Sequence, residues 1–563
     1  MKKLTFSILI IFSLFPLEGF CQNLTLIIEG QNKSESQTVD SLNYLRQHKD
    51  YNSIAAEMTS VQNSLQKLGY IENEIKTLYP INDSTFLAQM ALKHKFNTIY
   101  IYYNADAIDA SIIKTISTEV HNNYFKLNFS KIESTLNHIN NKVAEQGTPF
   151  SKLALSNITV RNDSIIEAHL KINSPYKKRT INNIVIKGYE KFPRGFLKHF
   201  LKIKTGQTFN ITEIKNKTEQ LANLNFAKEI KPPEVLFSKD STALYLFLEK
   251  TTSNAFDGFL GFGTNETTNK IEFNGYLNLT LNNNFHFGES FKLLYKSEEN
   301  DQKTFEVSST LPYLFKSPIG VDAALQIFKK DSSFTTVNQE AKIHYQINSK
   351  HKIFGGVTFT ESSYLRSTAS ATIQDYNTRL FNISHSYTNL QAGNLLFPTK
   401  SQFYLETGFG KRTTSAKQEK QTQLKLNASN IFKLNLQNSI YLRLNGSYLI
   451  SGDYFENELF RFGGINSIRG FEENSLYASL YGILNTEYRF KLNNSIYLHS
   501  IFDAGYFENK ISKTSQKLLG YGLGFGILTN AGLFKLNYAN GKTEDSNFKL
   551  SNSKIHISLT AHF

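Results

Sequence analysis

Cysteine and tryptophan are nearly missing from this chain of 563 residues: Cys21 is the only cysteine, and tryptophan does not occur. A disulfide framework and a cysteine metal site are therefore excluded beyond the N-terminus. No later stretch approaches the roughly 18 uninterrupted apolar residues that a membrane helix needs. Aromatic residues nevertheless make up 13% of the chain, with 45 Phe and 29 Tyr. This combination suits a β-barrel, whose membrane signal lies in the alternation of its strands.

Catalytic motifs are also missing. The chain has no Gly-x-Ser-x-Gly elbow and no His-Glu-x-x-His sequence, and its 13 histidines are dispersed. These patterns supply the nucleophiles and metal ligands of common hydrolases. We therefore expect that the chain is not an enzyme and has no cofactor and no metal site.

The net charge is +14, but the basic residues are scattered along the sequence. No basic helix and no known nucleic-acid module accompany them. We therefore expect no nucleic-acid partner. We interpret the charge as a solvated surface that anionic lipid headgroups attract.

The N-terminus has the order of a secretory signal peptide. Lys2 and Lys3 precede an apolar run from Leu4 to Leu17, and Gly19-Phe20-Cys21 follows it. This charged, apolar and small-residue order predicts a signal peptide over residues 1–21, cleaved after Cys21. A lipid anchor on Cys21 fits less well, because bulky Phe20 stands where such signals have a small residue.

Three similar segments recur in the first half of the chain. They are Asn82–Ala88, Asn162–Ala168 and Lys239–Tyr245. Their aspartates, Asp83, Asp163 and Asp240, lie 80 and 77 residues apart. A repeat of this length indicates tandem copies of one small domain. In each copy we expect Asp-Ser to form the turn of a hairpin.

The third copy shows the order of elements most clearly. We expect a strand at Asn183–Gly188, a helix at Arg194–Leu201, a second helix at Ile211–Leu224 and a strand pair that ends at Lys250. This order, with Gly206–Asn210 ahead of the second helix, resembles a polypeptide-transport-associated (POTRA) domain. In the first copy the matching segments are Leu24–Gly30, Ser53–Lys67 and a strand after Gly69-Tyr70; in the middle copy they are Phe129–Glu133 and Gly147–Phe150.

From about Thr251 to Phe563 the apolar period changes to two. Apolar residues alternate with polar ones in Ile271–Leu281, Ile343–Ile347 and Ile440–Tyr448. Such alternation places lipid on one side of a strand and water on the other. With membrane strands of about 9–11 residues, residues 251–563 have room for about 16 antiparallel strands.

The string Phe460–Phe471 resembles the barrel-loop motif of the BamA/TamA family of outer-membrane insertases. Its motif residues are Gly463, Gly464, Ile468, Arg469, Gly470 and Phe471. The segments Leu311–Pro318 and Asn394–Thr399 also resemble the family. The final strand, Ile555–Phe563, alternates and ends in Phe563, which is similar to the C-terminal signal by which such barrels are recognised for assembly.

The resemblance implies that Arg469 lies inside the lumen against acidic residues of neighbouring strands. Glu487 and Asp503 match those positions, and their place in the alternation puts both on the luminal face. A guanidinium between two carboxylates would pin a long loop. Gly520, Gly522, Gly524 and Gly526 share one face of a further strand, and we expect their missing side chains to make room for that loop.

The domain organisation follows from these patterns. We predict α+β periplasmic POTRA repeats followed by an all-β transmembrane barrel of about 16 strands. The boundaries are 1–21 for the signal peptide, 22–96, 97–174 and 175–250 for the repeats, and 251–563 for the barrel.

The resemblance implies an outer-membrane insertase or translocase with its repeats in the periplasm. Its partners would be unfolded outer-membrane protein clients, outer-membrane lipid, and periplasmic or inner-membrane assembly proteins. The client strand would pair with repeat edges and with a seam between Phe256–Phe262 and Ile555–Phe563. Three repeats, rather than the five of principal insertases, favour an accessory role.

Two alternatives remain open. A two-partner secretion transporter usually has two POTRA domains after a plug helix, whereas here the repeats begin close to the predicted cleavage site. A structural barrel that moves no polypeptide is compatible with the same sequence.

Overall fold

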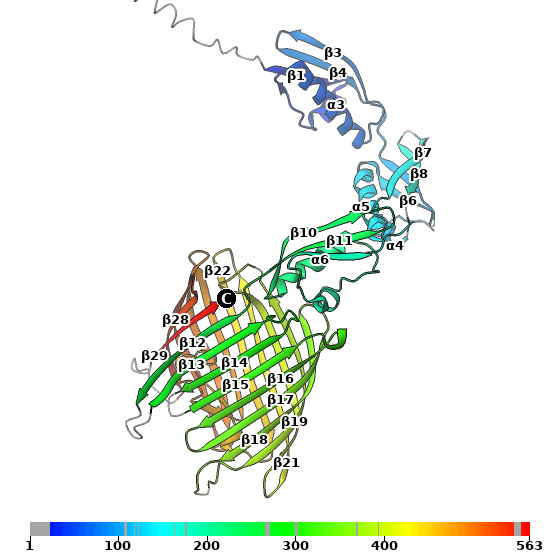
Figure 1. The fold of residues 1–563 in the computed structure, drawn as a ribbon. Coiled ribbons are helices and arrows are strands. Elements are labelled where there is room, and N and C mark those ends of the chain that lie inside the picture. Colours follow the sequence, from blue (N-terminus) through cyan, green and yellow to red (C-terminus); the bar gives the residue numbers. More distant parts are fainter. Residues whose placement is uncertain are drawn as a thin grey trace, which may run out of the picture. The chain divides into compact units, whose positions relative to one another are not determined.

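The computed structural model describes residues 23–105, 108, 110–117, 119–121, 123–162, 164–174, 177–264, 271–298, 302–367, 370–391, 393–544 and 553–563. The predicted signal peptide lies outside these residues. The described chain forms three small mixed sheets and a closed barrel (Figure 1). Its contacts define two compact units. The first ends at Arg179 and includes Thr208–Asn210, and the second holds Thr180–Gln207 and Ile211–Phe563.

The first repeat is a four-stranded sheet in the order β2-β1-β4-β3, covered by one long helix. Its elements are β1 (Leu24–Gly30), α2 (Lys33–Asp40), β2 (Gln47–His48), α3 (Tyr51–Lys67), β3 (Glu74–Asn82) and β4 (Thr85–Ala91). Helix α3 begins at a capping box, in which the Asp50 carboxylate accepts a hydrogen bond from the Ser53 backbone N–H at 2.8 Å. Its apolar residues recur every three or four positions and are buried: Ile54, Met58, Val61 and Leu65.

The second repeat has the same topology in the order β6-β5-β8-β7. Its elements are β5 (Thr98–Tyr102), α4 (Ala110–Lys114), β6 (Tyr124–Asn128), the 3₁₀ turn η1 (Phe129–Lys131), α5 (Ile132–Glu145), β7 (Lys152–Asn162) and β8 (Ile165–Asn173). Its core is apolar, with Ile99, Ile101, Phe125 and Ile139 almost completely buried.

The third repeat is a three-stranded sheet in the order β10-β11-β9. Its elements are β9 (Asn183–Gly188), the π-helical turn η2 (Phe196–Phe200), α6 (Ile211–Thr218), the 3₁₀ turn η3 (Glu219–Asn223), β10 (Ala227–Phe237) and β11 (Thr242–Lys250). The helix expected at Arg194–Leu201 is thus a single wide turn, and the one expected at Ile211–Leu224 changes to 3₁₀ geometry after Thr218.

Each repeat contains the hairpin that the recurring segments predicted. The turns join β3 to β4, β7 to β8, and β10 to β11. In the first two turns an asparagine side chain, rather than the aspartate, makes the hydrogen bond to the turn backbone. The Asn82 side chain accepts from the Ser84 N–H at 3.0 Å, and the Asn162 side chain accepts from the Ser164 N–H at 3.1 Å. Asp163 lies outside the described residues.

The barrel has 16 antiparallel strands and closes between its first and last strands (Figure 1). The strands are β12 (Ala255–Thr264), β13 (Ile271–Asn282), β14 (Ser290–Glu298), β15 (Gln302–Leu311), β16 (Ile319–Lys330), β17 (Phe334–Gln346), β18 (His351–Tyr364), β19 (Tyr376–Leu390), β20 (Thr399–Thr413), β21 (Gln418–Lys433), β22 (Asn438–Ser451), β25 (Leu480–Lys491), β26 (Ile496–Asn509), β27 (Thr514–Thr529), β28 (Gly532–Thr543) and β29 (Ser553–His562). The 3₁₀ turn η4 (Leu314–Lys316) lies between β15 and β16. The predicted fold class is therefore confirmed.

The strands alternate as the apolar period predicted. In β17, Lys342 and His344 are 7% and 1% exposed, whereas Ile343 and Tyr345 are 59% and 46% exposed. Polar residues thus face a crowded interior and apolar residues face outward. In the described part of the chain, no helix is both long and apolar enough to cross a membrane.

Candidate functional site

The connection from β22 to β25, residues 452–479, folds back into the barrel, and we call it the inner loop. It contains the 3₁₀ turn η5 (Glu456–Glu458) and a small hairpin of β23 (Phe460–Phe462) and β24 (Leu476–Ala478). Gly463, Gly464 and Gly470 have φ angles of 118°, 90° and 90°. Residues with a side chain rarely adopt such positive φ angles, so glycine suits all three positions.

Arg469 at the tip of the inner loop is enclosed by acidic side chains of the barrel wall. Its Nε and Nη2 donate to the two carboxylate oxygens of Asp503 at 2.9 and 2.6 Å, and its backbone N–H donates to Asp503 at 2.9 Å. Its Nη1 donates to Glu487, which also accepts from Arg489 Nε at 2.7 Å. The side chains of Arg469, Glu487 and Asp503 are at most 10% exposed. The two arginines and two carboxylates balance in charge, which makes their joint burial tolerable.

The other motif residues position this tip. Ile468 is fully buried among Phe462, Ala478 and Ile483, and Phe471 packs against the same cluster. A methyl group at Gly470 would overlap the backbone of β28, and methyl groups at Gly463 and Gly464 would overlap the returning segment at Glu472 and Glu473. The glycines therefore permit close backbone approach as well as unusual φ angles.

The strand glycines make room for the inner loop at fewer positions than we expected. A methyl group at Gly520 would overlap the Arg469 carbonyl oxygen. For the other three the expectation is wrong: the nearest atoms belong to Tyr538 at Gly522, to His499 and Asn537 at Gly524, and to Tyr497 at Gly526. These three accommodate neighbouring strands and luminal side chains. Gly541, which the sequence did not single out, lies against the Gly470 carbonyl oxygen.

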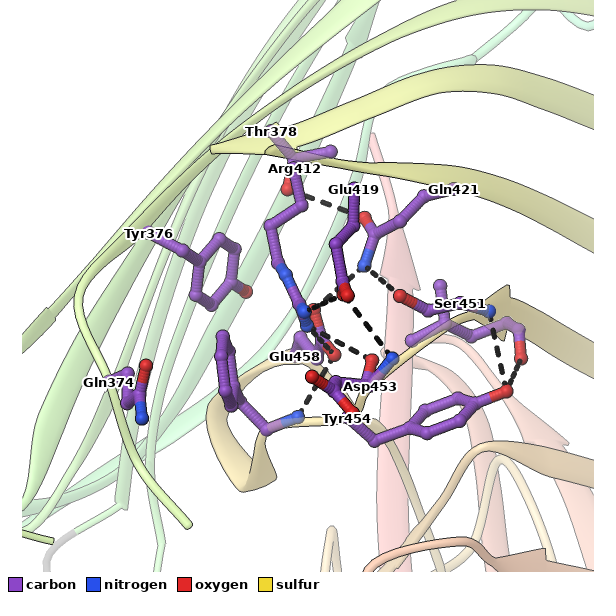
Figure 2. Close-up of polar contacts among 12 residues, drawn as sticks. Gln374, Tyr376, Thr378, Arg412, Glu419, Gln421, Ser451, Asp453, Tyr454 and Glu458 are labelled. Carbon is purple, nitrogen blue, oxygen red and sulfur yellow. Dashed lines mark hydrogen bonds and ion pairs between the residues drawn. The ribbon is translucent and has the colours of Figure 1, made fainter. Parts of the chain in front are cut away.

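A second anchor, centred on Arg412 of β20, holds the start of the inner loop (Figure 2). Arg412 is 1% exposed, pairs with Glu419 of β21, and donates to Glu458 at 2.5 Å and to the Asp453 carbonyl oxygen at 3.2 Å. Its guanidinium also lies 4.0 Å from the ring centre of Phe455. Sequence reasoning missed this anchor, because Arg412 and Glu458 lie 46 residues apart and belong to no motif.

Two adjacent acidic residues extend the tip toward opposite flanks of the closing strands. Glu472 pairs with Lys554 of β29 at 2.9 Å, and Glu473 pairs with Lys296 of β14 at 2.8 Å. Both acidic residues directly follow the motif, but no sequence pattern predicts their partners.

The tip borders a luminal cavity of about 1330 Å³. Its described lining includes nine Lys and Arg side chains against five Asp and Glu, so the cavity has an excess of positive charge. Ile555 and Ile557 of β29 also line it, together with Asp257 of β12. Tyr497 of β26 also lines the cavity, and Phe397 packs on it with ring centres 4.8 Å apart, which gives the segment Asn394–Thr399 a structural role.

The seam between the first and last strands is short. β12 and β29 pair at three residue positions, whereas β12 pairs with β13 at ten and β28 pairs with β29 at eight. Phe563 extends the seam through its backbone, because its N–H donates to the Asn254 carbonyl oxygen at 3.0 Å and its carbonyl oxygen accepts at 3.2 Å. The Phe563 side chain is more than half exposed.

No group of three His, Cys, Asp or Glu side chains in the described ranges is placed to hold a metal ion. The polar residues of the lumen instead bind one another and the inner loop. The arrangement can hold a loop in place and offer strand edges to a polypeptide.

Comparisons with known proteins identify the domains. Residues 283–560 match the Omp85 superfamily domain, and residues 179–249 match POTRA, a surface antigen variable number repeat. The search of curated proteins found no match.

Among solved structures, CdiB from Escherichia coli has 13% identity and a TM-score of 0.54, with 90% of this chain and 98% of that chain covered. CdiB from Acinetobacter baumannii has 15% identity and a TM-score of 0.52, with 90% and 97% covered. BamA from Haemophilus ducreyi lacking POTRA domains 1–3 has 14% identity and a TM-score of 0.48, with 82% and 99% covered. Such low identities show the fold alone.

The two family matches cover most of the barrel and the repeat that precedes it, and proteins with this barrel act in transport and assembly rather than as enzymes. The chain belongs to the Omp85 superfamily: it is an outer-membrane barrel protein whose POTRA region lies in the periplasm.

Proposed function

We propose that this protein inserts and assembles β-barrel proteins in the outer membrane by pairing client strands with its own strand edges. The short seam is the observation that carries the proposal. Residues Ser553–Leu559 of β29 pair with β28 but not with β12, and Gly258–Thr264 of β12 pair only with β13. Both strands therefore have backbone donors and acceptors that a third strand can use.

The chemistry requires little client sequence specificity. Main-chain hydrogen bonds supply the affinity when a strand adds to a sheet edge. The luminal cavity reaches the unpaired part of β29, so a client strand can approach that edge from the interior. The client's own burial in lipid supplies the driving force, because every backbone polar group must be satisfied there.

The repeats offer further edges. β3, β7 and β10 are edge strands of their sheets. Each presents apolar side chains to solvent, among them Ile81, Ile158 and Ile230, all more than half exposed. Exposed apolar edges are hazards that proteins normally avoid. Their recurrence in all three repeats supports a role in receiving unfolded clients.

A reversible lock on the seam tests the proposal. Phe256 and Ala561 face each other across it, and Cys21, the only native cysteine, lies in the predicted signal peptide. In the Phe256→Cys/Ala561→Cys variant, oxidation should abolish insertion of a urea-unfolded barrel client into proteoliposomes, and reduction should restore it. The control is Leu444→Cys/Leu484→Cys, which links two outward residues of β22 and β25 away from the seam.

The same assay separates the alternatives. Insertion at the parent rate by the oxidised seam variant would contradict the proposal. Delivery of a soluble polypeptide into the vesicle interior would instead indicate a secretion transporter, and no movement of either substrate would indicate a structural barrel.

A further inference from the structure

The tip of the inner loop, from Ile468 to Glu473, is held mainly by strands on one side of the seam. Arg469 bonds to Glu487 of β25 and Asp503 of β26, and Gly470 packs on β28. These strands all lie on the β29 side of the closure. The loop tip is therefore part of that wall of the barrel.

One ion pair from the tip reaches the other side. Glu473 binds Lys296 of β14, which is two strands beyond β12. Three strand ladders connect β14 to β29. β13 and β14 pair at eight residue positions, β12 and β13 at ten, and β12 and β29 at three. The seam is the weakest of these connections, so an added link across it acts where separation would begin.

Gly464 of the motif leaves the space that the Glu473 carboxylate occupies when it pairs with Lys296. A methyl group at Gly464 would overlap the Glu473 carboxylate. That carboxylate therefore lies directly over the Gly464 backbone, and both side chains of the Glu473–Lys296 pair are about three-quarters buried. The companion pair, Glu472–Lys554, is more exposed and holds β29, which β28 already holds over eight residues.

We propose that Glu473 is a positioning residue that keeps the seam closed by tying the β12–β14 wall to the inner loop through Lys296. This pair is a latch that a client strand must displace before it enters the seam. The inference rests on the proposed function for its purpose, but the latch itself is a property of the protein without client. Glu472 has a smaller part in it.

Hydrogen exchange of the full-length protein in lipid nanodiscs, without client, measures the latch. Glu473→Gln should speed exchange of the β12 amides by about twofold to fivefold, the range expected for one partly exposed ion pair. Glu472→Gln should have less effect, and Gly464→Ala should act like Glu473→Gln because it displaces the carboxylate. The reversed pair, Glu473→Lys with Lys296→Glu, should restore slow exchange.

Two readouts exclude a general loosening. Glu544→Gln breaks an exposed pair between Lys517 of β27 and the residue directly after β28, and it should leave β12 exchange unchanged. The Arg469 amide, which donates to Asp503, reports whether the loop remains docked. Fast β12 exchange with a protected Arg469 amide supports the latch. Loss of both protections would show that Glu473 merely holds the loop, and unchanged β12 exchange would show no latch; either result overturns the proposal.

The latch and the proposed function can fail independently. If Glu473→Gln speeds β12 exchange but the protein inserts no client, the latch is supported and the proposed function is wrong. If the protein inserts clients but Glu473→Gln leaves β12 exchange unchanged, the proposed function is supported and the latch is wrong.

Discussion

At the scale of single residues, Asp503 holds Arg469 more firmly than Glu487 does. It accepts three of the four hydrogen bonds that Arg469 makes to the two carboxylates, including the one from the backbone N–H. Glu487 divides its two oxygens between Arg469 and Arg489. The alternation of the strands placed both acids on the luminal face, but it could not rank them, because the ranking depends on where the loop backbone lies.

Neutralising Asp503 should therefore do more harm than neutralising Glu487. Asp503→Asn leaves a buried arginine with one full partner, and breaking such a pair costs about 3–5 kcal/mol in a fully buried site. Glu487→Gln keeps the bidentate bond to Asp503, so we expect the smaller loss. Client insertion in proteoliposomes and the thermal unfolding of each variant measure the two effects. Equal losses of insertion and of thermal stability in the two variants would show that Asp503 and Glu487 contribute equally to holding Arg469.

Gly520 should tolerate no side chain. Gly520→Ala places a methyl group on the Arg469 carbonyl oxygen, and such overpacking costs about 1–3 kcal/mol. Gly482 of β25 is the matched control, because a methyl group there meets no atom within 4 Å. The temperature at which the folded barrel loses its faster gel migration should fall for Gly520→Ala and stay constant for Gly482→Ala. Equal behaviour of the two variants would argue against close contact of the loop with β27.

At the scale of elements, sequence periodicity predicted the strands and hairpins, because these form from residues that are close together in the sequence. The alternation gave the barrel strands, and the 77- to 80-residue spacing gave the three hairpins. The short helix α2 was missed because it buries only Val39, which leaves no apolar period to detect. The Arg412 anchor was missed for a different reason: Arg412 lies on β20 and its partners come from β21 and the inner loop, and no local sequence pattern reports such a contact.

The N-cap of α3 should make the stability of the first repeat depend on pH. The hydrogen bond from the Ser53 backbone N–H holds the pKa of the Asp50 carboxyl below its usual range. A lowered folded-state pKa contributes stability above the unfolded pKa of about 3.9, and this contribution is lost as the pH falls through the folded pKa.

The measurement is thermal unfolding of a fragment of residues 23–179. Asp50→Ala should lower the melting temperature at pH 7, and the difference from the parent should shrink at pH 3. Asp50→Asn is the control, because asparagine caps a helix without titrating. A constant difference between parent and Asp50→Ala at both pH values would contradict the assignment.

At the scale of the whole molecule, Phe563 extends the strand pairing that closes the barrel. Phe563 pairs with Asn254 through both backbone groups, so deleting it shortens an already short seam. Phe563→Asp keeps those backbone bonds but puts a charge on an outward side chain. We expect both variants to reach the membrane in smaller amounts.

The two variants should differ once they are assembled. The deletion should also speed hydrogen exchange in β12, whereas Phe563→Asp should not. Quantifying the folded form on unboiled gels, together with exchange in β12, separates an assembly signal from a seam contact. Equal exchange in both variants would show that the terminal backbone bonds contribute nothing to closure.

The luminal cavity also has an electrical consequence. The inner loop lies within the lumen against side chains of the wall, so a planar bilayer containing the protein should conduct weakly. The surplus of lysine and arginine around the remaining space favours anions over cations. Under a potassium chloride gradient the reversal potential should therefore have the sign of chloride preference. Asp503→Asn, which loosens the loop, should raise the conductance, so current through a single molecule would report how long the loop stays docked.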